Sequence, residues 1–354
     1  MKRRNHIVRG SCVAVATLYL ALVSSAVQAD EMKLTETGST LVYPLFNVWV
    51  SEYEKTHPGV EITTSGTGSG AGIEQAIAGA VHIGTSDAYM SDAQAKQYPQ
   101  IIDVPLAISA LTVNFNLPGL NAARLKLDGP TLAGIYTGGI RSWDDRAIAT
   151  LNPGLALPHH DIIPVHRADG SGDTFVFTQY LTFSTPSWED KIGFGTSIAW
   201  PALVGQSANG NQGVLQMVQN TPYSLTYLGV SFHAQIKDAG LGTASLKSFD
   251  GEYLLPTADT ISAAAAALTP RTPLDERLTL VNAPGANAYP LVNYEYAMVS
   301  IKQPNAQIAK ALKRFLLWAI APDETNEKFL DDAHFIALPA HIWVLSHDQL
   351  EKIH

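Results

Sequence analysis

HRADGSGDT, residues 166–174, follows an apolar run at 162–165 and precedes residues 175–181, whose composition favours a helix. This order predicts a strand that ends where a helix begins. The first amide N–H groups of a helix have no partner within it and carry partial positive charge, so they suit an anion. The two glycines allow close backbone approach, Ser171 can donate a hydroxyl hydrogen, and Arg167 has a planar fork of donors. We interpret the stretch as an anion-binding loop.

Two further loops have the same design. SGTGSGAG, residues 65–72, follows the alternating, strand-like residues 60–64 and precedes apolar residues at helical spacing. Ser69 is expected at the start of that helix, where serine is a preferred cap. TGSTL, residues 37–41, is a weaker third candidate. Three such loops, one with an arginine, predict an oxyanion site more strongly than any one of them.

The first 29 residues have the pattern of a secretory signal. Basic residues precede the apolar residues 13–23, and small residues end the segment at Ala29. We therefore expect cleavage after Ala29 and a periplasmic protein. The single cysteine, Cys12, lies within this segment, so the mature chain would depend on core packing without disulfides. It is long enough for two domains.

The net charge of −9 becomes more negative once the basic signal segment is removed. No Lys/Arg cluster remains, which argues against nucleic acid or an anionic membrane surface as a partner. An acidic protein can still bind an anion, because the arginine and the helix starts act within a few ångströms while salt screens the overall field beyond about 8–10 Å.

Strand-like and helix-like stretches alternate along the chain, which predicts an α/β fold with mostly parallel sheets. Two segments, 105–110 and 282–288, have the composition of crossings between domains. We expect residues 30–108 and 286–354 to form lobe 1 and residues 109–285 to form lobe 2. A ligand would be enclosed between the lobes.

The loops also resemble a known family. Residues 66–72, 84–88 and 167–172, supported by 127–132 and 142–148, are similar to motifs of periplasmic phosphate-binding proteins, the substrate-binding components of high-affinity phosphate ABC importers. The resemblance implies a type II periplasmic binding protein fold, with two lobes of mostly parallel sheet flanked by helices and joined by two hinge strands. It also implies a monomer without cofactor, metal or enzymatic activity, which delivers inorganic phosphate to the membrane permease subunits.

The resemblance carries over a set of phosphate ligands: Thr40, the Leu41 amide, Ser69, Asp87, Arg167, Ser171 and the Gly172 amide. Two positions depart from the family. A phenylalanine commonly stands where this chain has Leu41, but only the amide is needed there. A threonine is usual where this chain has Asp173.

The chemistry of phosphate suggests roles for the carboxylates. Phosphate near neutral pH keeps at least one proton, so an ionised Asp87 can accept a hydrogen bond from it, whereas sulfate has no proton to give and would be repelled. Asp169 is expected to hold the Arg167 guanidinium. Asp173 has two interpretations: a helix-start residue turned to solvent, or a second carboxylate that accepts a second ligand proton.

Other functions fit parts of the sequence. Neither Ser69 nor Ser171 lies in the Gly-x-Ser-x-Gly pattern of a hydrolase nucleophile. Residues 159–161, His-His-Asp, look like part of a metal site but lie in a proline-flanked loop without a second cluster. The glycines at 66–68 followed by Asp87 fit a degenerate dinucleotide fingerprint, which leaves the arginine loop unexplained. A secreted phosphatase on the same scaffold, or a binding protein for sulfate, molybdate or a phosphonate, remains an alternative.

Overall fold

The computed structural model describes residues 32–201 and 205–354. The expected signal peptide, residues 1–29, lies outside the described residues. The main sheet has the strand order β2-β1-β3-β12-β4-β8-β6-β7, with β9 paired to β4, and a smaller sheet has the order β11-β10-β5. The strands are β1 (Met32–Gly38), β2 (Val60–Thr63), β3 (Ile83–Ser86), β4 (Ile101–Asn116), β5 (Lys126–Leu127), β6 (Ile163–Arg167), β7 (Gln206–Ala208), β8 (Ser224–Gly229), β9 (Gly242–Thr243), β10 (Ser245–Lys247), β11 (Tyr253–Leu254) and β12 (Val292–Ser300).

The parallel pairings lie at the two ends of the main sheet. At one end β1 pairs in parallel with β2 and β3, and at the other β6 pairs in parallel with β7 and β8. The pairings between them, β3 with β12, β12 with β4 and β4 with β8, are antiparallel. The fold is thus α/β with two parallel regions, as expected, joined by an antiparallel centre that the sequence patterns did not indicate.

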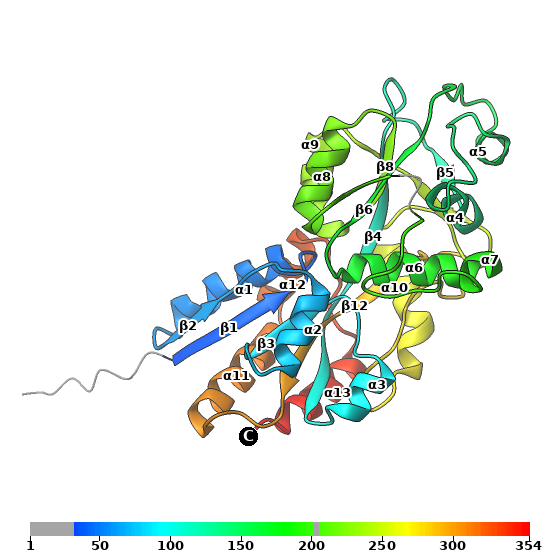
Figure 1. The fold of residues 1–354 in the computed structure, drawn as a ribbon. Coiled ribbons are helices and arrows are strands. Elements are labelled where there is room, and N and C mark those ends of the chain that lie inside the picture. The colour runs from blue at the N-terminus through cyan, green and yellow to red at the C-terminus, as the bar shows by residue number, and fades with distance from the viewer. Residues whose placement is uncertain (1–31, 202–204) are drawn as a thin grey trace, which may run out of the picture.

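β4 and β12 connect the two halves of the molecule (Figure 1). β4 pairs with β12 as far as Ala110 and with β8 from Leu111 onward. This change of partner lies at the end of the crossing expected at residues 105–110. Both strands are almost entirely buried, because helices or loops cover them on both sides. Burial of both faces explains why apolar residues predominate in β4 without strict alternation, whereas β12 also carries the buried polar residues Asn293 and Glu295.

Helices flank both parallel regions. α2 contacts β1 and β3, α11 contacts β1, and α8 contacts β6 and β8. The helices are α1 (Tyr43–Thr56), α2 (Ser69–Ile77), α3 (Asp92–Gln97), α4 (Gly129–Tyr136), α5 (Arg146–Leu151), α6 (Gly172–Ser184), α7 (Pro186–Glu189), α8 (Gly210–Asn220), α9 (His233–Asp238), α10 (Ala258–Leu268), α11 (Ala306–Ala319), α12 (Glu324–Asp332) and α13 (Ala340–Glu351), with 3-10 turns at Val230–Phe232 and Thr269–Arg271. A search of the described residues finds no helix with the length and apolar character needed to cross a membrane.

Candidate functional site

The arginine loop has the local structure that its sequence predicts. β6 ends at Arg167 and α6 begins at Gly172, with Ser171 as the N-cap residue. The Thr174 amide donates to Ser171 Oγ at 3.2 Å, which satisfies one of the unpaired amides of the first helical turn. Arg167 and Ser171 are both buried, so the loop lies inside the protein.

The second loop also connects a strand to a helix, but its cap differs from the expectation. Gly68, with a φ of 96°, occupies the N-cap position of α2, and Ser69 is the first helical residue. Ser69 Oγ instead accepts a hydrogen bond from the Asp87 amide at 3.2 Å. Because glycine tolerates this positive φ, it can occupy the cap position. The Ser69 hydroxyl is then not used as a cap and contacts the residue that follows β3.

The two loops come together from the two halves of the molecule. The Gly70 amide donates to the Gly170 carbonyl at 2.9 Å. A Cβ atom on Gly172 would lie 2.3 Å from Asp87 Oδ2 and 2.5 Å from Ser69 Oγ, so only glycine fits without a shift of these neighbours. The structure therefore places the start of α6 directly against the start of α2 and the end of β3.

Arg167 is held by two carboxylates. Its Nε donates to Asp169 Oδ1 at 2.8 Å, and its two terminal nitrogens bond Asp169 Oδ2 and Asp173 Oδ2. Burial alone would lower the pKa of Arg167, but the carboxylates of Asp173 and Asp169 hold it above its ordinary value. Burial would likewise raise the pKa of Asp169, but the hydrogen bond and charge of Arg167 keep it below its usual range. The contact that the sequence predicts for Asp169 is present.

Asp173 is fully buried, so the interpretation that its side chain turns to solvent is wrong. Its Oδ2 accepts from Arg167 and, at 2.7 Å, from Asn211 Nδ2, while Oδ1 is buried without a partner among the described residues. Burial and the nearby charge of Asp87 raise the pKa of Asp173 to about 7. The carboxyl group therefore titrates close to neutrality.

Asn211, at the start of α8, is a site residue that our reading of the sequence missed. Its backbone amide and Nδ2 donate to Thr40 Oγ1 at 3.2 and 3.0 Å, and its Oδ1 accepts from the Gly229 amide at 3.0 Å. With its bond to Asp173, it connects the third loop to the arginine loop. A signal was present, since β7 and α8 form another strand–loop–helix connection with a glycine.

The third loop contributes through Ser39 as well as through the expected residues. The Ser39 hydroxyl donates to Asp87 Oδ1, and its oxygen accepts from the Leu41 amide at 3.0 Å. The Ser39 hydroxyl thus links the Leu41 amide to the Asp87 carboxyl. Thr40, Leu41 and Asp87 are brought to the same place, together with a serine that we had not singled out.

The surroundings of Asp87 do not favour the ionised form of its carboxyl group. Burial raises its pKa well above the ordinary value, and the neighbouring Glu295 raises it further, against the opposing effects of Ser39 and Arg167. Glu295, on β12, was not among the residues that the sequence singled out. Asp87 can act as a charged acceptor toward a ligand only when it has lost its own proton.

The described residues contain no cluster of three or more histidine, cysteine or acidic side chains placed to hold a metal. His159 instead pairs with Asp144, its Nδ1 lying 2.9 Å from the carboxylate, at the protein surface. This pairing engages the first of the two histidines in the sequence segment 159–161.

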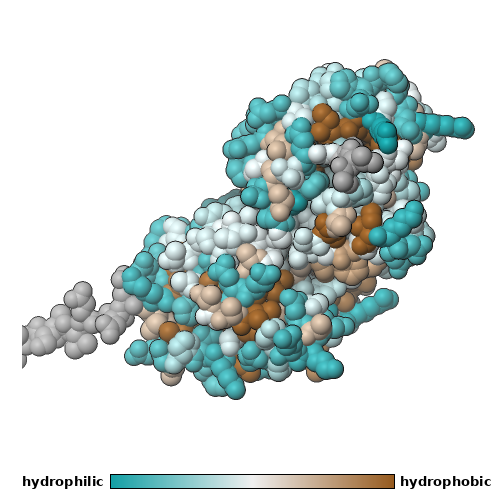
Figure 2. All heavy atoms as spheres, viewed as in Figure 1, coloured by the Kyte–Doolittle hydropathy of each residue, from teal (hydrophilic) through white to brown (hydrophobic). Residues whose placement is uncertain are grey.

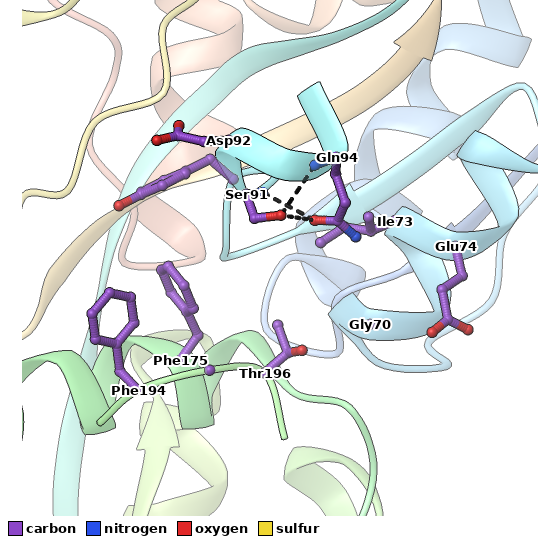
Figure 3. A pocket seen from close by; sticks show the side chains of 11 residues that line it. Gly70, Ile73, Glu74, Ser91, Asp92, Gln94, Phe175, Phe194 and Thr196 are labelled. Carbon is purple, nitrogen blue, oxygen red and sulfur yellow. Dashed lines mark hydrogen bonds between the residues drawn. The ribbon is translucent and has the colours of Figure 1, made fainter. Parts of the chain in front are cut away.

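A pocket of about 470 Å³ adjoins the contact between the loops but is separate from the buried cluster. Phe175 and Phe194 face the Ser91–Gln94 turn across it (Figure 3). Gly70 lines its inner side, whereas none of the charged residues around Arg167 does. On the outer surface, apolar side chains appear on both halves of the molecule among hydrophilic ones (Figure 2).

Comparison with known proteins identifies the class and then the family. Residues 23–323 match a family model described as the PBP superfamily domain, and the two-lobed fold with facing loops is that of a solute-binding protein. The chain is 35% identical to the phosphate-binding protein PstS of Methanocaldococcus jannaschii, over 82% of this chain and 79% of that one. It is 33% identical to PstS of Pasteurella multocida, over 92% of each chain. The chain belongs to the PstS family of phosphate-binding proteins.

Solved structures show the same fold. A high affinity periplasmic phosphate-binding protein bound with phosphate superposes with a TM-score of 0.71 at 21% identity, over 88% of this chain and 92% of that one. The phosphate-binding protein from Stenotrophomonas maltophilia gives a TM-score of 0.71 at 18% identity, over 90% and 94%. Both of these relatives are phosphate-binding proteins by name.

Proposed function

We propose that this protein captures inorganic phosphate between its two lobes and delivers it to the permease subunits of an ABC importer. The observation that carries the proposal is a loop that leads from a buried arginine at the end of β6 to the start of α6, and that contacts the start of a second helix beside a buried carboxyl group. Such a site offers donors for an oxyanion and one acceptor for its proton. Membership of the PstS family supports the choice of phosphate.

The proposed ligands combine the three loops: Thr40, the Leu41 amide, Ser69, Asp87, Arg167, Ser171, the Gly172 amide and Asp173. Asp169 orients Arg167 without touching the ligand. The lobes in this proposal are residues 30–108 with 286–354, and residues 109–285. The strand partners of β4, which change after Ala110, support a boundary close to that position.

The protein acts in the periplasm as a binding protein, not as an enzyme, and its signal segment is cleaved after Ala29. This part of the proposal rests on the basic, apolar and small-residue pattern of the first 29 residues. Calorimetric titration with phosphate, sulfate and molybdate, together with a phosphatase assay, tests whether the protein is a phosphate-binding protein and not an enzyme. We expect tight binding of phosphate alone and no hydrolysis. Hydrolysis of a phosphate ester, or preference for another oxyanion, would replace the proposed function by one of the alternatives.

Asp87→Asn should weaken phosphate binding modestly and narrow the gap between phosphate and sulfate. An amide can donate to either anion, whereas a carboxylate accepts from phosphate and repels sulfate. We expect a loss of about 1–2 kcal/mol for phosphate, typical of one altered hydrogen bond to a charged group. Competition titrations measure both affinities. A variant that rejects sulfate as strongly as the wild type would show that selectivity lies in another residue.

Asp173→Thr should flatten the dependence of phosphate affinity on pH. The pKa of Asp173 is raised to about 7 by burial and by the charge of Asp87, so the group loses its proton as the pH rises through neutrality. Its new negative charge then opposes an anion, and wild-type affinity should fall about tenfold further than that of the variant between about pH 6 and 9. Identical pH profiles would leave Asp173 as a structural partner of Arg167 and Asn211.

A further inference from the structure

Glu295 lies on β12, at an irregularity in its pairing with β4. Glu295 is opposite Ala107, whereas the next residue, Tyr296, is opposite Pro105, so the register shifts between them. Such a bulge redirects side chains and is common beside functional sites. The Glu295 side chain is fully buried, and it lies on one of the two strands that connect the halves of the molecule (Figure 1).

One carboxyl oxygen of Glu295 accepts hydrogen bonds from two side chains, whereas the other has no donor among the described residues. Oε1 accepts from Ser109 Oγ at 2.7 Å and from Asn293 Nδ2 at 3.0 Å. Oε2 is buried, and within residues 32–201 and 205–354 no N–H or hydroxyl group donates to it. In the antiparallel pairing of β12 with β3, Tyr296 is opposite Ser86, so Glu295 and Asp87 come next to each other at the end of this pairing, and the Glu295 carboxyl is close enough to raise the pKa of Asp87. Two carboxyl groups can form a hydrogen bond only if one of them carries a proton.

The charges around this pair favour keeping that proton. Burial raises the pKa of both groups, and Asp173 on α6 raises that of Glu295 further. Arg167 on β6 acts in the opposite direction on Asp87, but its guanidinium is already paired with Asp169 and Asp173. A bound phosphate would add more negative charge to the same enclosed space. Full ionisation of both carboxyl groups beside the anion is therefore disfavoured.

We propose that Asp87 and Glu295 share one proton, and that this proton rests on Glu295 while Asp87 accepts a hydrogen bond from bound phosphate. The protonated carboxyl of Glu295 then donates a hydrogen bond to Asp87, and the Ser39 hydroxyl donates to Asp87 Oδ1. The remaining lone pairs of the Asp87 carboxylate are left to accept a hydrogen bond from the proton of the ligand. Glu295 is a positioning residue that never touches phosphate. It sets the pH range in which Asp87 is a charged acceptor, and this role rests on the proposed phosphate site.

The test compares wild type, Glu295→Gln and the control Glu276→Gln. Glutamine has nearly the shape of protonated glutamate, and its amide can donate to Asp87 at every pH. Glu276 is a matched control because it too is fully buried, accepts from a serine (Ser346, 2.7 Å) and has a second oxygen without a partner among the described residues. Its neighbours do not include Asp87 or Arg167.

Calorimetric phosphate titrations from pH 6 to 9, each in two buffers of different ionisation enthalpy, give the affinity and the protons exchanged. We expect Glu295→Gln to match wild type within about threefold at pH 6, to bind about tenfold more tightly than wild type at pH 9, and to take up fewer protons on binding. Glu276→Gln should follow the wild type. Superimposable profiles for Glu295→Gln and wild type, or an equal shift in the control, would overturn the proposal.

Thermal unfolding without phosphate separates this inference from the proposed function. A carboxyl whose folded pKa lies above its unfolded value makes the folded state bind more protons, so stability falls as the pH rises through that range. If Asp87 and Glu295 share a proton, we expect the stability of the wild type to fall as the pH rises, and that of Glu295→Gln to fall less. A protein that binds no phosphate but shows this difference would refute the phosphate site and keep the proton pair. Equal stability profiles would refute the pair.

Discussion

Arg167→Ala should abolish measurable phosphate binding at micromolar concentrations. Arg167 is buried between Asp169 and Asp173, and its guanidinium balances the charge of both carboxylates at the start of α6. Without it, an incoming anion would meet these carboxylates uncompensated. Removal of one partner from a buried ion pair costs about 3–5 kcal/mol, which corresponds to a loss of about two to four orders of magnitude in affinity. Calorimetric titration measures the effect.

Arg277→Ala is the matched control for this experiment. Arg277 also bonds two carboxylates, Asp275 and Asp92, but those carboxylates are exposed and the group lies outside the loops. We expect its substitution to leave phosphate affinity unchanged. Arg167→Lys should retain part of the binding, because it keeps the charge and loses the fork. If Arg167→Ala kept its affinity within tenfold of the wild type, Arg167 would not contact the ligand.

Gly172→Ala should weaken phosphate binding strongly, because it prevents the contact between the two loops. The new methyl group would lie 2.3 Å from Asp87 Oδ2, 2.5 Å from Ser69 Oγ and 2.6 Å from Asp87 Cβ. Asp87 and Ser69 are short, buried side chains with little freedom to move, so the two loops could not come together as they do here. Overpacking of this kind costs about 1–3 kcal/mol, or a loss of about five- to 150-fold in affinity.

The helix itself should not suffer from this change. Gly172 is the first residue of α6, and alanine is the better helix former by roughly 0.5–1 kcal/mol. Gly59→Ala is a suitable control, since a methyl group there meets no atom within 4 Å. Thermal unfolding and phosphate titration together check the prediction. Full phosphate affinity in Gly172→Ala, or an equal loss of affinity in the control, would contradict the prediction.

The local secondary structure around the arginine loop, and its short-range ion pair, can be predicted from the sequence. Strand, loop and helix at residues 162–181 are where the composition predicts them, because the apolar run, the glycines and the Ser171 cap act over a few neighbouring residues. The ion pair of Arg167 with Asp169 joins residues two apart and is likewise predictable. Ser69 marks the limit of such reasoning, since a glycine with positive φ took the cap position beside it.

The contacts between loops were decided by the tertiary structure. Asn211 contacts Thr40 across 171 residues of sequence, and the antiparallel pairing of β12 with β3 brings Glu295 to Asp87. Asp173, whose burial excluded one interpretation of it, likewise accepts a hydrogen bond from the distant Asn211. Capping, turn and charge preferences act over a few residues and can be read from the sequence. The proton balance of buried carboxyls depends on which distant strands enclose them, and that is fixed only when the sheet assembles.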